Sequence, residues 1–204
     1  MVGIVLGAGS SSRLGRPKQT LPLGDTTVLG WVMRDVEASS LERVVLVVGG
    51  AAGEALAKLN LRRAEVAHND AYGTGCASSL LAGLDAVGPC ESTMLLLGDM
   101  PGVDGTVIEA VRADFERERL WGAVTRYRDG LGHPFVFAAE ALPALRSLHG
   151  DKAVWKLLER LPQRVGRLAV DRPRPRDINT WEDYREVASS LAAPPASQAE
   201  TAWR

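Results

Sequence analysis

The sequence predicts a single α/β domain, in which a mostly parallel central sheet has helices on both faces and carries a small antiparallel element. Residues 43–48 form a continuous, mostly β-branched run without polar alternation, which is typical of a strand buried on both faces of a parallel sheet. Residues 2–6 and 93–97 are apolar in the same way. Segments with the apolar spacing of helices lie between these runs. A chain of 204 residues is long enough for one well-buried domain and short for two.

The composition is that of an ordinary globular protein. Hydrophobic residues make up 46% and charged residues 24%, and a formal net charge of -1 gives no bulk attraction to nucleic acid or to a membrane surface. The chain has no signal-peptide pattern and no apolar run near the ~20 residues that a membrane span needs. We therefore expect a cytoplasmic protein with neither nucleic acid nor membrane as a partner. Cys76 and Cys90 lie outside any zinc-binding pattern and are either free thiols or a single disulfide.

A loop rich in glycine and serine follows the first strand, residues 2–6. Gly7 and Gly9 allow the chain to turn tightly and to aim consecutive backbone N–H groups at an anion. Each backbone N–H group carries only a partial positive charge, and Arg13 and Lys18 can add full positive charges. The pattern is typical of a phosphate-binding loop, and an ordinary strand-to-helix turn with solvated charges is the alternative.

Two common phosphate-binding motifs do not fit this loop. The dinucleotide fingerprint needs a third glycine where Ser12 stands, and an acidic residue after the second strand, where the chain has Gly49 and Gly50. The P-loop needs Gly-Lys followed by Ser or Thr, but Gly15 is followed by Arg16. Both kinds of site are therefore disfavoured.

Apolar spacing and capping residues predict the helices. Asp25, Thr26 or Thr27 can cap a helix that carries five apolar residues on one face. Thr106 and Glu109 form a capping box for a later helix, for which Asp104 is the other candidate start. The predicted helices cover 28–36, 52–59, 76–87, 104–115, 140–148 and 151–161, and Thr180 caps a last one.

The later strands are predicted at 65–67, 122–127, 133–137 and 165–170. The segment between 122–127 and 133–137 contains Asp129-Gly130, which is a hairpin signal. Such a hairpin adds an antiparallel member to a mostly parallel sheet. Residues 189–204 are rich in Ala, Pro and Ser, so we expect a disordered tail there after a domain of residues 1–188.

Asp99 follows the strand 93–97 within Gly98-Asp99-Met100-Pro101. Open α/β sheets bind ligands beyond the carboxyl ends of their strands. Hard cations such as Mg²⁺ take oxygen ligands, and one or two carboxylates together with substrate phosphates hold them. Asp99 is thus the leading candidate metal ligand, and a turn or helix-cap role is the alternative.

A turn-rich loop at 68–75 leads into the helix 76–87, which begins with small residues that include Ser78 and Ser79. Small residues let an anion approach the free N–H groups of the first helical turn. Plain capping with close packing is the alternative.

The run LGAGSSSRLGRPKQTLPLG resembles the signature Leu-x-Ala-Gly-x-x-x-Arg-Met/Leu-Gly-x-x-Lys of the molybdopterin nucleotidyltransferases, the MobA-like and MocA-like enzymes. Leu-Gly-Asp-Met-Pro matches the metal motif of this family, and Gly-His-Pro resembles its acceptor motif. The segment 177–183 resembles the Asp-Ile-Asp-Thr-Pro-Glu-Asp box of the family, with Asn179 in place of the second aspartate and Trp181 in place of the proline. The resemblance covers residues 2–187, with the four motifs in the family's order.

The resemblance implies a Rossmann-like fold of the nucleotide-diphospho-sugar transferase (GT-A) type. It implies transfer of CMP from CTP to the molybdenum cofactor, a molybdopterin, with release of pyrophosphate and with Mg²⁺ as cofactor. The cytidylyl branch is the closer one, because Ala8 stands where the guanylyl branch usually has glycine. A molybdoenzyme or its maturation chaperone is then an expected partner.

Residue roles also follow from the resemblance. Arg13, Lys18 and Asp99 are the expected catalytic residues, with the two cations on the β- and γ-phosphates and Asp99 on the metal. Asn179 is the second expected metal ligand, as a neutral oxygen donor. The expected nucleotide-binding residues are Leu6, Gly7, Ala8, Gly9, Ser10, Arg13, Lys18, Gly49, Gly75 and Asp99.

Ser78, His133 and Asp151 are the expected acceptor-binding residues. A packed histidine and a helix cap are the alternatives for His133 and Asp151. Other functions also remain open: transfer from GTP, transfer to another small phosphorylated acceptor such as a sugar phosphate, a non-catalytic cofactor carrier, or a nicotinamide-dependent redox protein. Asn179 favours the carrier, and the missing dinucleotide fingerprint counts against the redox protein.

Overall fold

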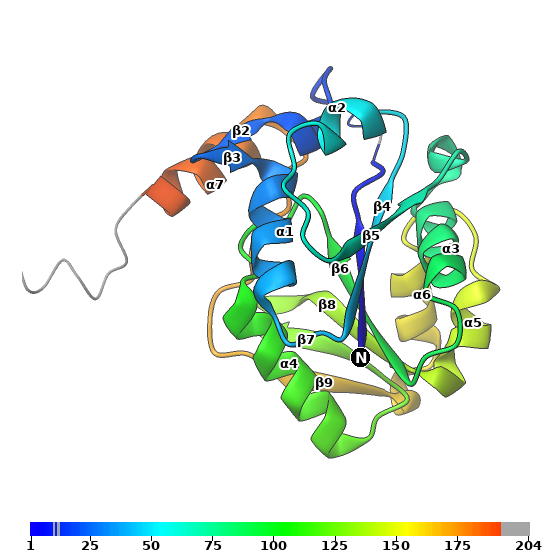
Figure 1. The fold of residues 1–204 in the computed structure, drawn as a ribbon. Coiled ribbons are helices and arrows are strands. Elements are labelled where there is room, and N and C mark those ends of the chain that lie inside the picture. Colours follow the sequence, from blue (N-terminus) through cyan, green and yellow to red (C-terminus); the bar gives the residue numbers. More distant parts are fainter. Residues whose placement is uncertain (10, 12, 193–204) are drawn as a thin grey trace, which may run out of the picture.

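A computed structural model of the chain describes residues 1–9, 11 and 13–192. Within them, a seven-stranded sheet has the order β5-β4-β1-β6-β8-β7-β9, and β2-β3 form a small antiparallel sheet (Figure 1). In the large sheet β8 is antiparallel to β6 and β7, and the other pairs are parallel. The predicted fold class is therefore confirmed. The strands are β1 (Val2–Leu6), β2 (Pro22–Leu23), β3 (Thr26–Thr27), β4 (Arg43–Val48), β5 (Ala64–His68), β6 (Ser92–Leu97), β7 (Gly122–Tyr127), β8 (Gly130–Ala138) and β9 (Val165–Ala169).

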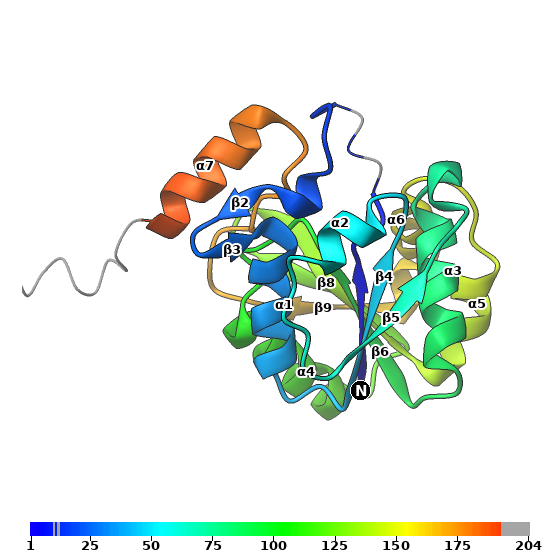
Figure 2. The same ribbon diagram turned by 45° about the horizontal axis from the view of Figure 1, so that its top comes forward.

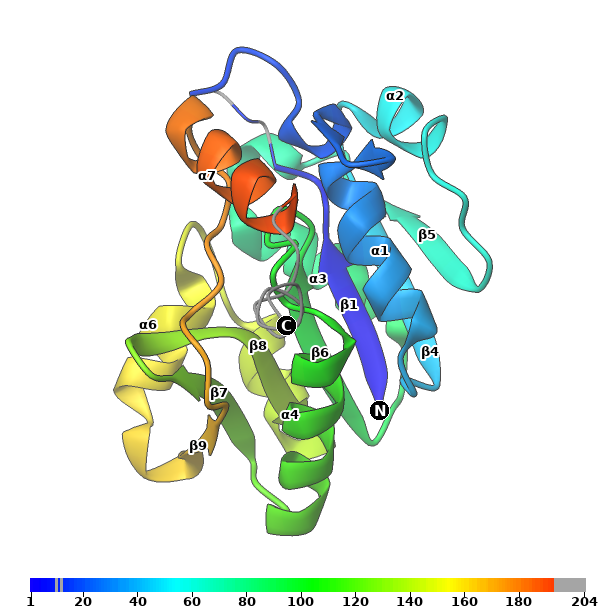
Figure 3. The same ribbon diagram turned by 90° about the vertical axis from the view of Figure 1, so that its left-hand side faces the viewer.

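Helices cover both faces of the large sheet and bury its apolar side chains in two clusters (Figures 1 and 3). Helices α1 and α4 pack on one face, and α3, α5 and α6 pack on the other. A third cluster joins α7 to the small sheet, and the Tyr184 hydroxyl donates to the Pro22 carbonyl there (2.6 Å; Figure 2). The α-helices are α1 (Val28–Ala38), α2 (Ala52–Leu56), α3 (Cys76–Val87), α4 (Gly105–Glu118), α5 (Leu142–Arg146), α6 (Ala153–Arg160) and α7 (Trp181–Ala192), and short 3-10 helices include η1 (Lys18–Thr20) and η2 (Tyr72–Thr74).

The strand register brings distant loops to one edge of the sheet. Leu6 pairs with Val47 on β4 and with Leu97 on β6, so these three strands end together. Because β8 runs the other way, with Phe135 opposite Leu95, its first residues lie at the edge where β6 ends. The loops after β1, β4 and β6 therefore meet the start of β8 at a single edge, which is where such sheets bind ligands.

Helices α1 and α4 begin at residues that were predicted as caps, and for α4 the structure decides between the two candidates Asp104 and Thr106. The Thr27 hydroxyl accepts from Gly30 N (3.0 Å) and caps α1, which confirms that prediction. The predicted capping box of Thr106 is wrong, because the Asp104 carboxylate caps α4 at Val107 N (3.1 Å). The Glu109 carboxylate instead accepts from the backbone and side chain of Ser40. Glu109 therefore binds Ser40, which is 69 residues away in sequence, instead of completing a local capping box with Thr106.

Several elements begin or end at residues other than those predicted. Helix α2 ends at Leu56 rather than near residue 59, and β8 begins at Gly130, so the hairpin turn is shorter than expected. Helix α7 continues to Ala192, so residues 189–192 are helical and do not belong to a loose tail. The Thr180 side chain accepts from Asp183 N (3.2 Å), as predicted for its cap. Residues 193–204 lie outside the described part of the chain.

Cys76 is an exposed free thiol and Cys90 is a half-buried one, so the alternative of a disulfide does not hold. None of the helices in the described part of the chain has both the length and the apolar character that a bilayer crossing requires.

Two helical glycines give a matched test of the packing between α3 and the sheet. A Cβ on Gly83 would lie 2.6 Å from Ile4 Cγ2 and 3.1 Å from Val47 Cγ2, whereas Gly53 in α2 has nothing within 4 Å. Ile4 and Val47 are fully buried and cannot move aside. We expect Gly83→Ala to lower the free energy of unfolding by about 1–3 kcal/mol through overpacking. We expect Gly53→Ala to raise it by up to about 1 kcal/mol. Urea unfolding of both variants checks the two signs, and a stabilised Gly83→Ala variant would contradict the packing described.

Candidate active site

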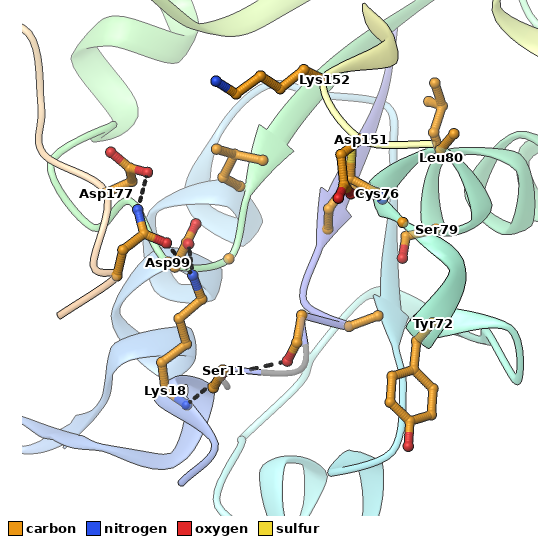
Figure 4. A pocket seen from close by; sticks show the side chains of 18 of the residues that line it. Ser11, Lys18, Tyr72, Cys76, Ser79, Leu80, Asp99, Asp151, Lys152 and Asp177 are labelled. Atoms are coloured by element: carbon orange, nitrogen blue, oxygen red, sulfur yellow. Dashed lines mark hydrogen bonds and ion pairs between the residues drawn. The ribbon is translucent and has the colours of Figure 1, made fainter. Parts of the chain in front are cut away.

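A cavity of about 590 Å³ opens at the edge of the sheet where β1 and β6 end and β8 begins (Figure 4). Its walls come from the loop after β1, the N-terminal turn of α3, the first turn of α6 and the segment before α7. Together with the end of β6 and the start of β8, these regions are far apart in sequence and enclose one space. This position agrees with the general ligand site of open α/β sheets.

The ammonium group of Lys18 lies at the centre of the polar interactions in this cavity. It forms an ion pair with the Asp99 carboxylate and donates to the Ile178 carbonyl (3.0 Å) and to Asn179 Oδ1 (3.1 Å). The Lys18 and Asp99 side chains are only 12% and 14% exposed. Asn179 Nδ2 in turn donates to the Asp177 carboxylate, which sets the amide oxygen toward Lys18. These contacts tie η1, the end of β6 and the segment before α7 into one unit.

Burial raises the pKa of Asp99 above its ordinary value, and the negative charge of Asp177 acts in the same direction. The Lys18 ammonium opposes both effects because it stabilises the ionised carboxylate. A buried carboxylate depends on such a counter-ion, since removal of one partner leaves an uncompensated charge in the interior.

Gln19 and Ser11 hold the glycine-rich loop in its conformation. The buried Gln19 amide donates to the carbonyls of Gly7 (2.9 Å) and Gly9 (3.0 Å). The Ser11 hydroxyl accepts from Lys18 N (2.9 Å), and Ser11 itself has a left-handed backbone (φ 54°). The Gly7 N–H donates to Val47 O (2.8 Å), so this amide belongs to the sheet and is not free for an anion, contrary to the expectation for Gly7.

The N-terminus of α3 is closed by the chain turn at residues 150–151. The Asp151 carboxylate accepts from Cys76 N (3.0 Å), and the Gly150 carbonyl accepts from Ala77 N (3.2 Å). Gly75 makes this approach possible, because its φ of 115° favours glycine and a Cβ there would lie 2.9 Å from the Gly150 carbonyl carbon. The prediction of free N–H groups for an anion at this helix start is therefore wrong. Asp151 caps α3, and not the helix that follows it in sequence.

Ser78 and its neighbour Ser79 differ in whether they line the cavity. The Ser78 hydroxyl accepts from Asn69 Nδ2 (2.9 Å) and lies within hydrogen-bond distance of the Gly75 carbonyl (2.8 Å), so it fastens the loop before α3. Ser79 also accepts from Asn69 Nδ2 (2.9 Å) and lines the cavity, which Ser78 does not. Position 79 is therefore the serine at the cavity wall.

Aromatic side chains form the wall of the cavity opposite the glycine-rich loop. The His133 ring lies against Phe135 with ring centroids 3.9 Å apart, and Trp155 meets Phe135 edge to face at 4.9 Å. Burial lowers the pKa of His133 to about 3, and the Asp177 carboxylate opposes this shift only weakly. His133 is therefore neutral at physiological pH. It is packed in this wall, as the alternative above describes, and it also lines the cavity, while its binding of an acceptor stays a prediction.

Most of the predicted site residues lie together, and a few do not. Ser10 lies outside the described residues. Gly49 lies beneath Tyr72, where a Cβ would be 2.9 Å from both Ala8 O and Tyr72 Cβ, and like Gly7 and Ser78 it is not on the cavity wall. The predicted residues that line the cavity are Leu6, Ala8, Gly9, Arg13, Lys18, Gly75, Asp99, His133, Asp151 and Asn179.

Several cavity residues were not predicted as such. Gln19 directly follows Lys18, but the sequence carries no signal that its amide is buried against the carbonyls of the loop. Asp177 was noted only as part of a motif. Lys152 directly follows the predicted acceptor residue Asp151, whereas Trp155 carried no signal, because its region reads as an ordinary amphipathic helix. Tyr72, which is 38% exposed, lies at the rim of the cavity (Figure 4).

The described residues contain no group of three or more His, Cys, Asp or Glu side chains that would hold a metal by themselves. The oxygens of Asp99, Ile178 and Asn179 that surround the Lys18 ammonium are nevertheless of the kind that a hard cation prefers. One or two such ligands suffice when substrate phosphates complete the coordination. The residues present therefore fit a divalent cation bound together with a nucleotide.

The fold and the site define an α/β protein with a ligand cavity beyond the ends of parallel strands. Residues 3–165 match the model of the MobA-like NTP transferase domain, and the chain belongs to this family. Among characterised relatives, the nicotine blue oxidoreductase of Paenarthrobacter nicotinovorans is 29% identical over 194 residues, 91% of this chain and 95% of that protein. The molybdenum cofactor cytidylyltransferase of Escherichia coli K12 is 29% identical over 146 residues, 68% of this chain and 70% of that protein.

Solved structures agree with this assignment. The crystal structure of a homologue of Mycobacterium tuberculosis Rv0371c from Mycobacterium sp. strain JC1 has a TM-score of 0.85 at 38% identity and covers 93% of this chain and 96% of that one. Rv0371c of Mycobacterium tuberculosis H37Rv in complex with manganese has a TM-score of 0.79 at 37% identity and covers 92% of this chain and 97% of that one. Family, fold and site together support nucleotidyltransferase activity, and the manganese complex indicates use of a divalent metal in the family.

The lowered pKa of His133 predicts a pH dependence of stability. The group has a pKa of about 3 when folded against about 6.5 when unfolded, so the unfolded chain binds more protons between these values. Stability contributed by His133 is complete above pH 6.5 and is lost as the pH falls toward 3, at up to about 1.4 kcal/mol per pH unit. We expect a His133→Phe variant to lose stability less steeply over this range. Urea unfolding at several pH values measures the difference, and parallel curves for the two proteins would contradict it.

Proposed function

We propose that the protein transfers CMP from CTP to the molybdenum cofactor and releases pyrophosphate. The observation that carries the proposal is the Lys18–Asp99 pair, which joins the glycine-rich loop to the end of β6 at the cavity. The cytidylyltransferase relative and the alanine at position 8 support CTP and a molybdopterin acceptor. A molybdoenzyme, or the chaperone that matures it, would then receive the product.

The phosphate of the acceptor is already an anionic nucleophile, so the reaction needs no general base. The protein has to hold two anionic groups in line and to neutralise the charge that develops on the leaving pyrophosphate. Arg13, which is exposed at the cavity mouth, and Lys18 serve the β- and γ-phosphates in this proposal. His133 is neutral and packed, so it acts as a wall of the acceptor site rather than as a base.

Asp99 and Asn179 are the proposed ligands of Mg²⁺, which would screen the charge of the triphosphate. Asn179 replaces the aspartate of the family motif, but its amide oxygen is oriented by the Asp177 carboxylate. The loss of the second carboxylate on the metal is therefore partly offset by a fixed neutral oxygen. This orientation weakens the argument that Asn179 marks a carrier that does not catalyse.

A redox activity is the second candidate, because the oxidoreductase relative aligns with 91% of this chain. The glycine-rich loop has Ser12 where a dinucleotide fingerprint needs its third glycine, and the chain has Gly49-Gly50 after β4 where an acidic residue would bind the ribose. These differences favour nucleotidyl transfer. Oxidation of NADH or NADPH by the purified protein with a quinone-type dye tests the redox candidate directly.

The experiment that tests the proposed function is pyrophosphate release with Mg²⁺ and CTP, GTP, ATP or UTP, each with and without molybdopterin. The proposal predicts release with CTP that requires the pterin. Release with GTP would move the assignment to guanylyl transfer, and release with a sugar phosphate instead of the pterin would change the acceptor. No release with any nucleotide, together with tight pterin binding, would support a carrier.

Two substitutions test the proposed catalytic pair. We expect Lys18→Ala and Asp99→Ala each to reduce kcat on the order of a hundredfold or more, because each removes a charge that stabilises the transition state. Lys58→Ala is the matched control, since Lys58 forms only an exposed ion pair with Glu54 on the surface. Circular dichroism confirms that each variant is folded. Near-normal turnover by either folded cavity variant would contradict the assigned roles.

A further inference from the structure

The Lys18 ammonium is surrounded by oxygen atoms in the manner of a bound cation. Its neighbours are the Asp99 carboxylate, the Ile178 carbonyl at 3.0 Å and Asn179 Oδ1 at 3.1 Å, which we call the Asp99 cradle. A carboxylate, a backbone carbonyl and an amide oxygen are also the donors that a hard divalent cation takes. The same three groups can therefore hold either cation.

The cradle is a rigid part of the molecule. Ile178 is fully buried, and its N–H donates to the Asp99 carbonyl (3.0 Å), which fixes the segment against the end of β6. Asn179 cannot turn its NH₂ group into the cradle without the loss of its hydrogen bond to Asp177. The oxygens thus stay in place whether or not Lys18 is there, whereas Lys18 is carried on a flexible four-carbon stem.

Two cations cannot share this small space. An ammonium and a divalent ion within a few ångströms of each other repel strongly in a partly buried site. With Lys18 in the cradle, the Asp99 carboxylate that contacts it is already neutralised. A metal ion in the free protein must therefore displace Lys18 and leave the ammonium without its partner.

We infer that Lys18 is the resident cation of the metal site, and that a divalent ion enters the Asp99 cradle only when Lys18 leaves it for the phosphates of a nucleotide. This inference rests on the proposed nucleotide site for the destination of Lys18. It makes metal binding and nucleotide binding mutually dependent, because each is favoured by the same movement and such coupling is reciprocal. The protein alone then binds metal weakly and does not hold an ion without substrate.

The test measures Mn²⁺ binding to the nucleotide-free protein by electron paramagnetic resonance of the unbound ion. We expect Lys18→Met to bind Mn²⁺ at least about tenfold more tightly than the wild type, because a competing charge at contact distance has been removed. Lys152→Met is the matched control, since Lys152 lines the same cavity but is not in the cradle. It should change the affinity less than threefold. Asp99→Asn added to Lys18→Met should abolish the gain.

A second readout covers the case in which Lys18→Met is too unstable for binding measurements. In that case the Tm is measured with and without Mn²⁺. The increase in Tm should be several degrees larger for Lys18→Met and Lys18→Gln than for the wild type, because the ion replaces the missing counter-ion of Asp99. Equal Mn²⁺ affinities and equal Tm shifts for wild type and Lys18 variants would overturn the inference. No nucleotide or acceptor is present, so this failure is distinguishable from failure of the proposed transfer reaction.

Discussion

The partly buried ion pair between Lys18 and Asp99 is the interaction on which the site depends. It connects the loop after β1, the end of β6 and the segment before α7, which are separated by 81 and by about 160 residues along the chain. A pair of this kind is costly to bury and more costly to break, since the remaining charge would be left in the interior. The pair therefore serves to position two groups of opposite charge, at the place where phosphates and a metal would bind.

The sheet topology supplies the frame for this pair. Parallel strands β1, β4 and β6 end at one edge, which brings the loop that leads to Lys18 close to Asp99 after β6. The reversal of β8 adds its first residues, and with them the aromatic wall at His133, to the same edge. The contact of Asp151 with the start of α3 then closes the cavity from the helical side. Backbone direction thus decides which side chains can meet.

The sequence was informative wherever a signal is local. The bounds of β4 and α3 were predicted to the residue, because continuous apolar runs and helical spacing directly reflect burial. Interactions between residues far apart in sequence were not predictable. Asp151 was expected to cap its own helix or to bind the acceptor, but it caps α3, 75 residues away, and the role of Gln19 follows from carbonyl groups that only the folded loop presents. The motifs identified the place of the site and not its hydrogen bonds.

The most direct measurement is a crystal structure of the protein with Mg²⁺ and a non-hydrolysable CTP analogue. The account predicts that the Lys18 ammonium has left Asp99 for a β- or γ-phosphate oxygen, and that the metal lies on Asp99 and Asn179 within the cavity. A triphosphate bound elsewhere, or bound in the cavity while Lys18 stays on Asp99 and no metal contacts the carboxylate, would contradict it.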